Sequence, residues 1–191
     1  MAQYNGYVTV PHGSYDEWRR ATYGNGYNVD FAWGNQCWDY CSLLYYQYRM
    51  TLITGGKYAY QCWTLSRKIN SRSPFIAIEG KENIKRGDII VFNRHGNNKT
   101  GHIAFADEDY NGSNYIRIVG QNQGGANGNV NDIKSSLTFF LGIFRNTLWK
   151  GGSPSPTPDP EPDEDDPRQR WKKDFPWAVA WNNWYGFMDD L

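Results

Sequence analysis

The spacing of apolar residues in the first half of the chain predicts helices. From residue 37 to residue 50 the apolar positions recur at i, i+4, i+7, i+8 and i+11, the pattern of one helical face. This helix is expected to begin at or just before Cys37, directly after a turn-rich segment. A second helix is expected at about residues 58–69. A short one is expected at residues 14–20, where Ser14 caps and Glu17 stands three residues later.

From Gly87 onward the pattern changes from a helical period to strands. Runs rich in β-branched and aromatic residues are separated by turns rich in Asn and Gly. The expected strands are residues 88–93, 102–107, 115–120 and 137–145. Helices followed by an antiparallel sheet are typical of an α+β fold, so we expect N-terminal helices packed on that sheet.

The last 41 residues have a different composition. Residues 154–167 hold six prolines and six acidic residues, so residues 151–168 are expected to be an extended acidic, proline-rich linker. In residues 169–191, Trp177, Trp181, Trp184 and Met188 have helical spacing. We interpret that segment as an aromatic docking element, with packing onto the first domain as the alternative. Residues 1–150 are then expected to form one domain.

Two residues in this framework are candidates for nucleophilic catalysis. Cys37 opens the long helix, and His102 opens an apolar strand. A helix N-terminus and a nearby imidazole both lower the pKa of a thiol, which favours the reactive thiolate. The competing histidines, His12 and His95, lie in turn-rich segments. A single cysteine or histidine is more often structural than catalytic. The hypothesis of nucleophilic catalysis therefore depends on the pairing of Cys37 with His102.

Residues 28 to about 145 resemble the CHAP domain, a papain-like cysteine amidohydrolase or peptidase of bacterial and phage cell-wall lysins. The matching motifs occur in the family's order. They are Asp30, the run from Gln36 to Tyr40, the run from Gly87 to Phe92, the run from Gly101 to Phe105, and the run from Gly120 to Gln123. The resemblance implies a papain-like fold in which Cys37 attacks an amide carbonyl and His102 transfers the proton.

The third catalytic residue is where this chain departs from the family. The family commonly carries Glu at the position of Gly120, so we expect Asn122 to orient His102, with Gln121 as second choice. The backbone N–H of Cys37, aided by Gln36, is expected to stabilise the oxyanion.

The resemblance also implies a calcium site. Some CHAP members bind calcium with the spacing seen here, in which the ligands would be Asn28, Asp30, the carbonyls of Ala32 and Gly34, and Asp39. Oxygen ligands of this kind suit Ca²⁺. In the alternative interpretation, Asp39 only caps the helix and Asp30 only fixes a turn.

Composition indicates which classes of partner the chain can bind. Aromatic residues make up 17% of the chain, which suits binding to sugar-rich or peptide surfaces. Residues 1–150 hold 16 Lys and Arg against 11 Asp and Glu, and this positive excess is too small and scattered for a nucleic-acid surface. Three cysteines do not suggest a disulfide framework. We expect no transmembrane segment and see no secretory signal.

These features favour a bacteriophage peptidoglycan hydrolase, an endolysin or a virion tail-associated lysin, that cleaves an amide of the wall peptide. It would act at the bacterial cell wall, released by host lysis or carried in the virion tail, with tail proteins as partners of the C-terminal segment. Two alternatives are a cysteine peptidase or amidase acting on soluble substrates, and a non-enzymatic virion or wall-binding component with a weakened site.

Overall fold

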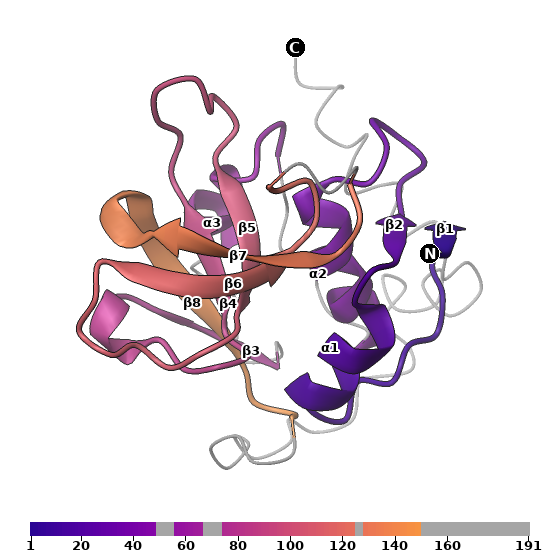
Figure 1. The fold of residues 1–191 in the computed structure, drawn as a ribbon, viewed down its shortest axis with the longest axis horizontal. Helices are drawn as coiled ribbons and strands as arrows, with labels where there is room; N and C mark the ends of the chain where they lie inside the picture. The colour runs from indigo at the N-terminus through magenta and orange to yellow at the C-terminus, as the bar shows by residue number, and fades with distance from the viewer. Residues whose placement is uncertain (49–55, 67–73, 125–127, 150–191) are drawn as a thin grey trace, which may run out of the picture. The chain divides into compact units, whose positions relative to one another are not determined.

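The computed structural model describes residues 1–48, 56–66, 74–124 and 128–149, and its largest element is a six-stranded antiparallel sheet (Figure 1). The expected linker and docking segment lie outside the described residues. The helical elements are α1 (Tyr15–Thr22), α2 (Cys37–Gln47), α3 (Gln61–Ser66), η1 (Lys81–Asn83) and η2 (Leu137–Phe139). The strands are β1 (Gln3–Asn5), β2 (Gly26–Asn28), β3 (Phe75–Ile78), β4 (Ile89–Phe92), β5 (His102–Ala106), β6 (Tyr115–Gly120), β7 (Asn131–Ser136) and β8 (Phe140–Asn146). Helices and an antiparallel sheet confirm the expected α+β class.

The sheet order places the expected histidine strand in the interior of the sheet. The order is β3-β8-β4-β5-β6-β7, and every pair is antiparallel. In the β4–β5 pair, His102 lies opposite Phe92. The short strands β1 and β2 form a separate parallel pair. At the level of His102 the partner strand is β4, whereas β6 pairs with the far end of β5 at Phe105 and Ala106, so β4 fixes the position of His102.

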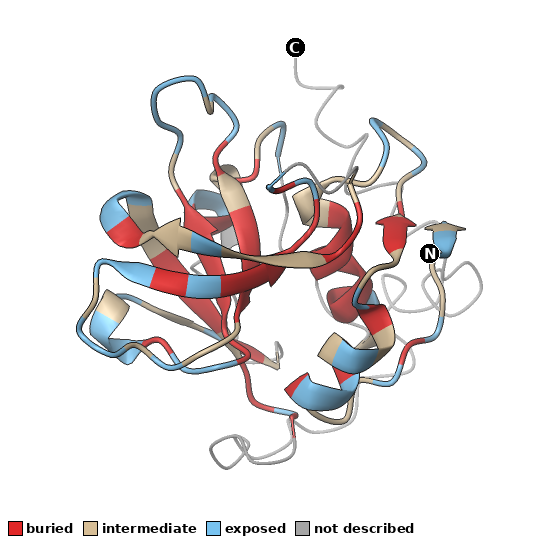
Figure 2. Cartoon of the chain, in the orientation of Figure 1, coloured by how far each residue is buried: buried red, intermediate tan, exposed pale blue. Residues whose placement is uncertain are grey.

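The helix starts follow from local capping. Ser14 Oγ accepts from the backbone N–H of Glu17 at 3.2 Å, so α1 begins as expected. At α2, Asp39 Oδ2 accepts from the backbone N–H of Gln36 at 2.8 Å, which satisfies a donor at the helix start. All residues from Asp39 to Tyr45 are buried. The middle of α2 is thus buried on all sides (Figure 2), which is wider burial than the one expected face, while Tyr46 in its last turn is exposed.

Apolar residues cover both faces of the sheet. One face packs against the helices, and α2 lies on β5. Its sheet residues include Ile89, Val91, Ile103, Phe105, Val119 and Phe144. The opposite face packs against Ile84, the residue after η1, and Leu137 of η2. Its sheet residues include Ile90, Phe92, Ala104, Ala106, Ile116, Ile118 and Ile143. Alternate residues of β5 therefore belong to two cores, and this double burial makes the strand rigid.

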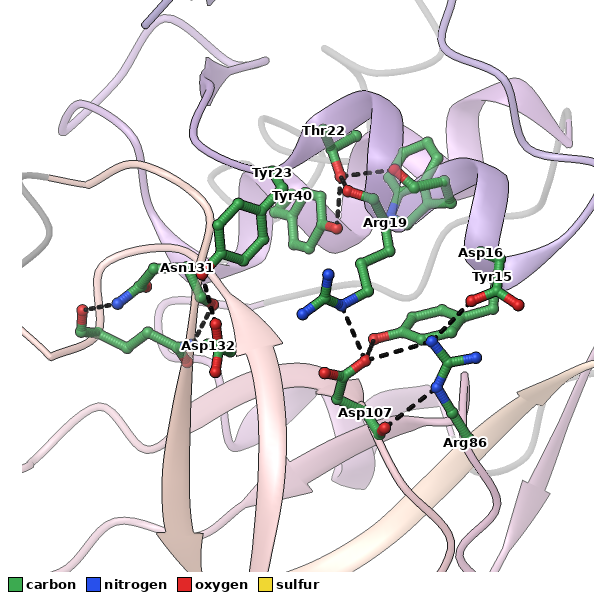
Figure 3. A network of polar contacts seen from close by, with 12 residues as sticks. Tyr15, Asp16, Arg19, Thr22, Tyr23, Tyr40, Arg86, Asp107, Asn131 and Asp132 are labelled. Carbon is green, nitrogen blue, oxygen red and sulfur yellow. Dashed lines mark hydrogen bonds and ion pairs between the residues drawn. The ribbon is translucent and has the colours of Figure 1, made fainter.

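A polar network fixes α1 to the sheet (Figure 3). Asp107 directly follows β5, its side chain is only 5% exposed, and it accepts hydrogen bonds from Tyr15 Oη at 3.0 Å and Arg19 Nε at 2.9 Å. Arg86 bridges Asp107 to Asp16, with a 2.7 Å ion pair to Asp16. The buried carboxylate has several partners, as a charge in a protein interior requires.

Several elements differ from the sequence expectation. The third helix is shorter than residues 58–69 over its described part, and β3 and β7 were not expected. The β7 strand is mostly polar and lies at the sheet edge, so it lacks the apolar alternation that identifies strands. Over the described residues, none of the helices has both the length and the apolar character needed to cross a bilayer.

Candidate active site

Cys37 is the first residue of α2, and its side chain faces the start of β5. The backbone N–H of Ile103, the residue after His102, interacts with the sulfur, as do the N–H groups of Cys37 and Trp38. Cys37 keeps partial exposure, whereas Cys41 and Cys62 are buried in the core. The helix start therefore places one accessible thiol beside the histidine strand.

The electrostatics of this thiol differ from the expectation. Burial raises the pKa of Cys37 to about 11, and the nearby N–H groups only partly oppose that rise. Burial thus outweighs the expected lowering of the pKa by the helix start, because the desolvation of the thiolate costs more free energy than its hydrogen bonds to the N–H groups provide. This raised pKa favours the protonated thiol of Cys37 at neutral pH.

His102 is held by a residue that the sequence analysis did not select. Its Nε2 lies 2.7 Å from Oε1 of Gln123, a buried residue in the connection after β6. The other end of that amide, Gln123 Nε2, donates to the backbone carbonyl of Asn131 at 2.8 Å. A carbonyl only accepts, so Oε1 must face the ring, and Nε2 of His102 must carry the hydrogen. Nδ1 is then the basic nitrogen of the neutral ring.

Burial also determines the charge of His102. Desolvation lowers the pKa of the imidazole, and the hydrogen bond to Gln123 opposes this only in part. Both shifts favour a neutral thiol and a neutral imidazole near pH 7. Such a pair can work by general-base catalysis, in which the proton moves as the sulfur attacks.

The expected third residue, Asn122, has a different partner in the structure. Its Nδ2 donates to Gln36 Oε1 at 2.8 Å, and Gln123 occupies the expected place on the His102 ring. The second choice, Gln121, is fully buried and binds the backbone of Tyr27 and the carbonyl of Gln36. The consecutive side-chain amides of Gln121, Asn122 and Gln123 thus bind three different sets of partners. The sequence pattern cannot separate them, because only the chain reversal after β6 decides which amide faces the ring.

The second expected oxyanion residue, Gln36, is fixed on two sides. Its side-chain Nε2 donates to the carbonyl of Trp33 at 2.6 Å, and its backbone N–H is bound by Asp39. A primary amide has two N–H donors, so one Nε2 hydrogen remains in addition to the backbone N–H of Cys37. Both expected donors thus belong to the first two residues at the start of α2.

Of the expected calcium ligands, Asp30 precedes α2 and Asp39 lies in its first turn, and the two carboxylates are close enough to interact. Asp39 Oδ1 accepts from the backbone N–H of Val29 at 2.9 Å, and Asp30 Oδ1 accepts from that of Ala32 at 2.8 Å. Burial, followed by the charge of Asp30, raises the pKa of Asp39 to about 7. Asn28 Oδ1 is buried without a hydrogen-bond partner. Asp39 therefore caps the helix and Asp30 fixes a turn, as the alternative interpretation expects. In addition, Asn28 Oδ1 lacks a partner.

The backbone around these residues is unusual. Across the described ranges, the non-glycine residues with positive φ are Phe31 (61°), Trp33 (61°) and Asn122 (52°). Trp33 and Asn122 are hydrogen-bonded to the side chain of Gln36, and Phe31 and Trp33 are exposed aromatics. Left-handed conformations of bulky residues are costly and concentrate at ligand-binding and catalytic segments.

The remaining candidates lie elsewhere. His12 Nδ1 contacts the carbonyl of Val10 at 2.8 Å, and the His95 ring stacks on Phe139. In the part of the chain that the structure describes, no three side chains of His, Cys, Asp or Glu cluster in a metal-binding arrangement. Any cation in the segment before α2 would therefore need amide and carbonyl oxygens in addition to the two carboxylates.

Comparison with known proteins agrees with this geometry. The sequence is 34% identical over 126 residues to a "D-alanyl-L-alanine endopeptidase" of Streptococcus phage B30, a match that covers 63% of this chain and 27% of the relative. The fold resembles the crystal structure of the wild-type endolysin LysIME-EF1, with a TM-score of 0.53 and 18% identity over 69% of this chain and 63% of that one. This chain thus spans about a quarter of the length of its curated relative. The CHAP domain model matches residues 22–122, which is more than half of the chain and includes Cys37 and His102. The chain belongs to the CHAP domain family.

Proposed function

We propose that this chain is a phage peptidoglycan hydrolase that cuts an amide bond of the wall peptide through Cys37 and His102. The observation that carries the proposal is the thiol at the start of α2 beside the first residues of β5, where an amide orients the imidazole. The name of the phage B30 relative favours a peptide bond as the target. An amidase cut between glycan and peptide is the alternative.

The chemistry follows from the protonation states. As Cys37 Sγ attacks the carbonyl carbon, Nδ1 of His102 takes the thiol proton. The carbonyl oxygen gains the negative charge, and the N–H of Cys37 and the free Nε2 hydrogen of Gln36 stabilise it. The imidazolium then protonates the leaving amine, the C–N bond breaks and a thioester remains. Water, deprotonated by Nδ1, attacks the thioester and releases the carboxylic acid and the thiol.

Lysis of isolated walls tests this proposal. We expect Cys37→Ser and His102→Ala to abolish the loss of turbidity of Gram-positive walls, whereas His95→Ala, a change at an exposed histidine, retains it. Mass spectrometry of the fragments then identifies the bond, because new N-termini indicate an endopeptidase and free L-Ala termini indicate an amidase. Undiminished lysis by both active-site variants would refute the proposal. Cleavage of casein or a small amide without any action on walls would favour a soluble substrate.

We further propose that Ca²⁺ binds between the segment before α2 and the first turn of that helix. The residues fit this ion in three respects. Asn28 Oδ1 lacks a partner, Asp30 and Asp39 are close enough to repel each other, and the left-handed Phe31 and Trp33 turn the intervening backbone. Carboxylates have free lone pairs beyond their present hydrogen bonds. The ligands would be Asn28, Asp30, Asp39 and the carbonyls of Ala32 and Gly34, and the ion would neutralise the two acids and hold this segment.

Thermal unfolding tests the ion without reference to activity. A ligand that binds only the native state raises the melting temperature with concentration. We expect millimolar Ca²⁺ to stabilise the wild type and an Asp109→Asn control, and not to stabilise Asp30→Asn. If the wild type shows no shift and keeps full activity in EGTA, the metal has no part in this protein.

The place of work is also a proposal. The protein would act at the bacterial wall, reached by host lysis or from a virion tail. Residues 169–191, which lie outside the described part, would contact a tail protein in the second case. The acidic, proline-rich composition of residues 151–168 supports a spacer between the two parts.

A further inference from the structure

We propose that Gln123 is the positioning residue for the catalytic histidine and that Gly120 supplies the space this side chain needs. The inference rests on the proposed function of Cys37 and His102. It assigns the third member of the site to a residue that lies just beyond the matched family segment, which ends at Asn122.

The contacts of Gln123 fix its amide at both ends. Oε1 meets His102 Nε2 at 2.7 Å, and Nε2 donates to the carbonyl of Asn131 at 2.8 Å. The main chain is fixed as well, because Asn131 Nδ2 donates to the carbonyl of Gln123 at 3.3 Å. Gln123 is 7% exposed, so water does not compete for these bonds. The side chain therefore selects the tautomer with hydrogen on Nε2, the one that leaves Nδ1 free as the base.

The space for this amide comes from two small residues. A Cβ placed on Gly120 would lie 2.9 Å from Gln123 Oε1 and 2.9 Å from Ala104 Cβ. Both distances are shorter than an ordinary carbon contact. A side chain at position 120 and the observed position of Gln123 therefore exclude each other. Gly120 stands where the family resemblance led us to expect Glu, so here a neutral amide occupies the space next to His102.

The exchange of a carboxylate for an amide has a chemical consequence. A carboxylate on Nε2 would stabilise the imidazolium, whereas an amide oxygen orients the ring without adding a charge. The low pKa of His102, which burial causes, agrees with this neutral partner. The histidine is thus a base that is available at neutral pH and below.

The first test measures His102 directly. The chain has three histidines, so ¹⁵N NMR of the labelled full-length protein resolves each ring, and His12 and His95 act as internal controls. We expect hydrogen on Nε2 of His102 in the wild type. Gln123→Glu should raise the pKa of His102 by about one pH unit or more. Asn122→Asp introduces the same charge one residue away and should raise it less, because that side chain points to Gln36.

The second test uses rates. Gln123→Ala should lower kcat for wall hydrolysis by roughly 10²-fold, the scale for a misplaced catalytic group. Gly120→Ala should also lower kcat, because its Cβ displaces the amide. In the Gln123→Ala background the same change should have a much smaller effect on kcat, because the displaced group is already gone. Melting temperatures separate this loss from unfolding.

Two results would overturn the assignment. One is an unchanged His102 tautomer and pKa in Gln123→Ala and Gln123→Glu. The other is a larger pKa change in Asn122→Asp than in Gln123→Glu, which would return the role to Asn122. If the wild type fails to hydrolyse walls, the proposed function fails, yet the NMR experiment still decides whether Gln123 positions the ring.

Discussion

Asn122 and Gln36 are joined by a 2.8 Å hydrogen bond from the amide of the first to Oε1 of the second. The bond connects the segment after β6 to the residue that precedes Cys37. Gln36 Nε2 donates in turn to Trp33, so the amide is held at both ends. Asn122 thus helps to hold the side chain of Gln36, one of the expected oxyanion donors.

We therefore expect Gln36→Ala to lower kcat by about 10–10²-fold with little change in KM, because an oxyanion donor acts mainly in the transition state. Asn122→Ala should have a smaller effect, about tenfold or less, since it only frees the Gln36 side chain. Steady-state kinetics on a soluble wall peptide measure both. If Gln36→Ala instead raises KM by a similar factor and leaves kcat unchanged, Gln36 contributes to substrate binding.

The titration of the site predicts its pH dependence. Hydrolysis needs neutral His102, whose pKa burial lowers, so the activity should persist as the pH falls and decline only below about 6.5. Gln123→Glu should move this decline to higher pH. Initial rates between pH 4 and 9 in buffers of constant ionic strength give the profile. An acid limb centred well above 6.5 in the wild type would contradict a buried neutral base.

Alkylation of Cys37 should follow the thiolate fraction. Because burial raises the pKa of Cys37 to about 11, the rate with iodoacetamide should be slow at pH 7 and still increase above pH 9. Peptide mapping distinguishes Cys37 from Cys41 and Cys62. Fast alkylation at pH 7 that does not change up to pH 9 would indicate a thiolate–imidazolium pair. Slow alkylation is thus compatible with an active enzyme, and the rate alone does not identify an inactive wall-binding protein.

The Asp107 network predicts a stability effect remote from the chemistry. Asp107→Ala leaves Tyr15 and Arg19 without their acceptor, and we expect a loss of about 2–3 kcal/mol in the free energy of unfolding. The exposed Asp16→Ala should cost about 1 kcal/mol or less, as surface ion pairs contribute little. Urea denaturation of both variants provides the comparison. Equal losses would show that burial of the Asp107 carboxylate is not what matters.

Removal of residues 151–191 tests the interpretation of the C-terminal part. We expect the shortened chain to hydrolyse isolated walls at nearly the full rate, because Cys37, His102 and Gln123 all lie before residue 124. Association with a virion tail protein should be lost, as measured by co-purification with phage particles. Unfolding of the shortened chain, or an unchanged association, would contradict a docking role.

The sequence by itself was sufficient for the local features of this protein. The period of apolar residues, the Ser14 cap and the strand runs depend on neighbours along the chain, and the structure has α1, α2 and strands β4, β5 and β6 at those places. The α+β class and the family follow from the same local patterns. Cys37 at a helix start and His102 at a strand start were also recognisable, since each is defined by its own element.

Only the tertiary structure decided the relations between distant residues. Edge strand β7 forms because β6 offers it a partner, and its own sequence carries little apolar alternation. The pKa of Cys37 depends on burial by residues far along the chain, and this outweighs the helix start. Which amide reaches His102 depends on the turn after β6 and on the space at Gly120. Hydrogen bonds and desolvation act over a few ångströms in space, and spacing along the sequence does not encode those distances.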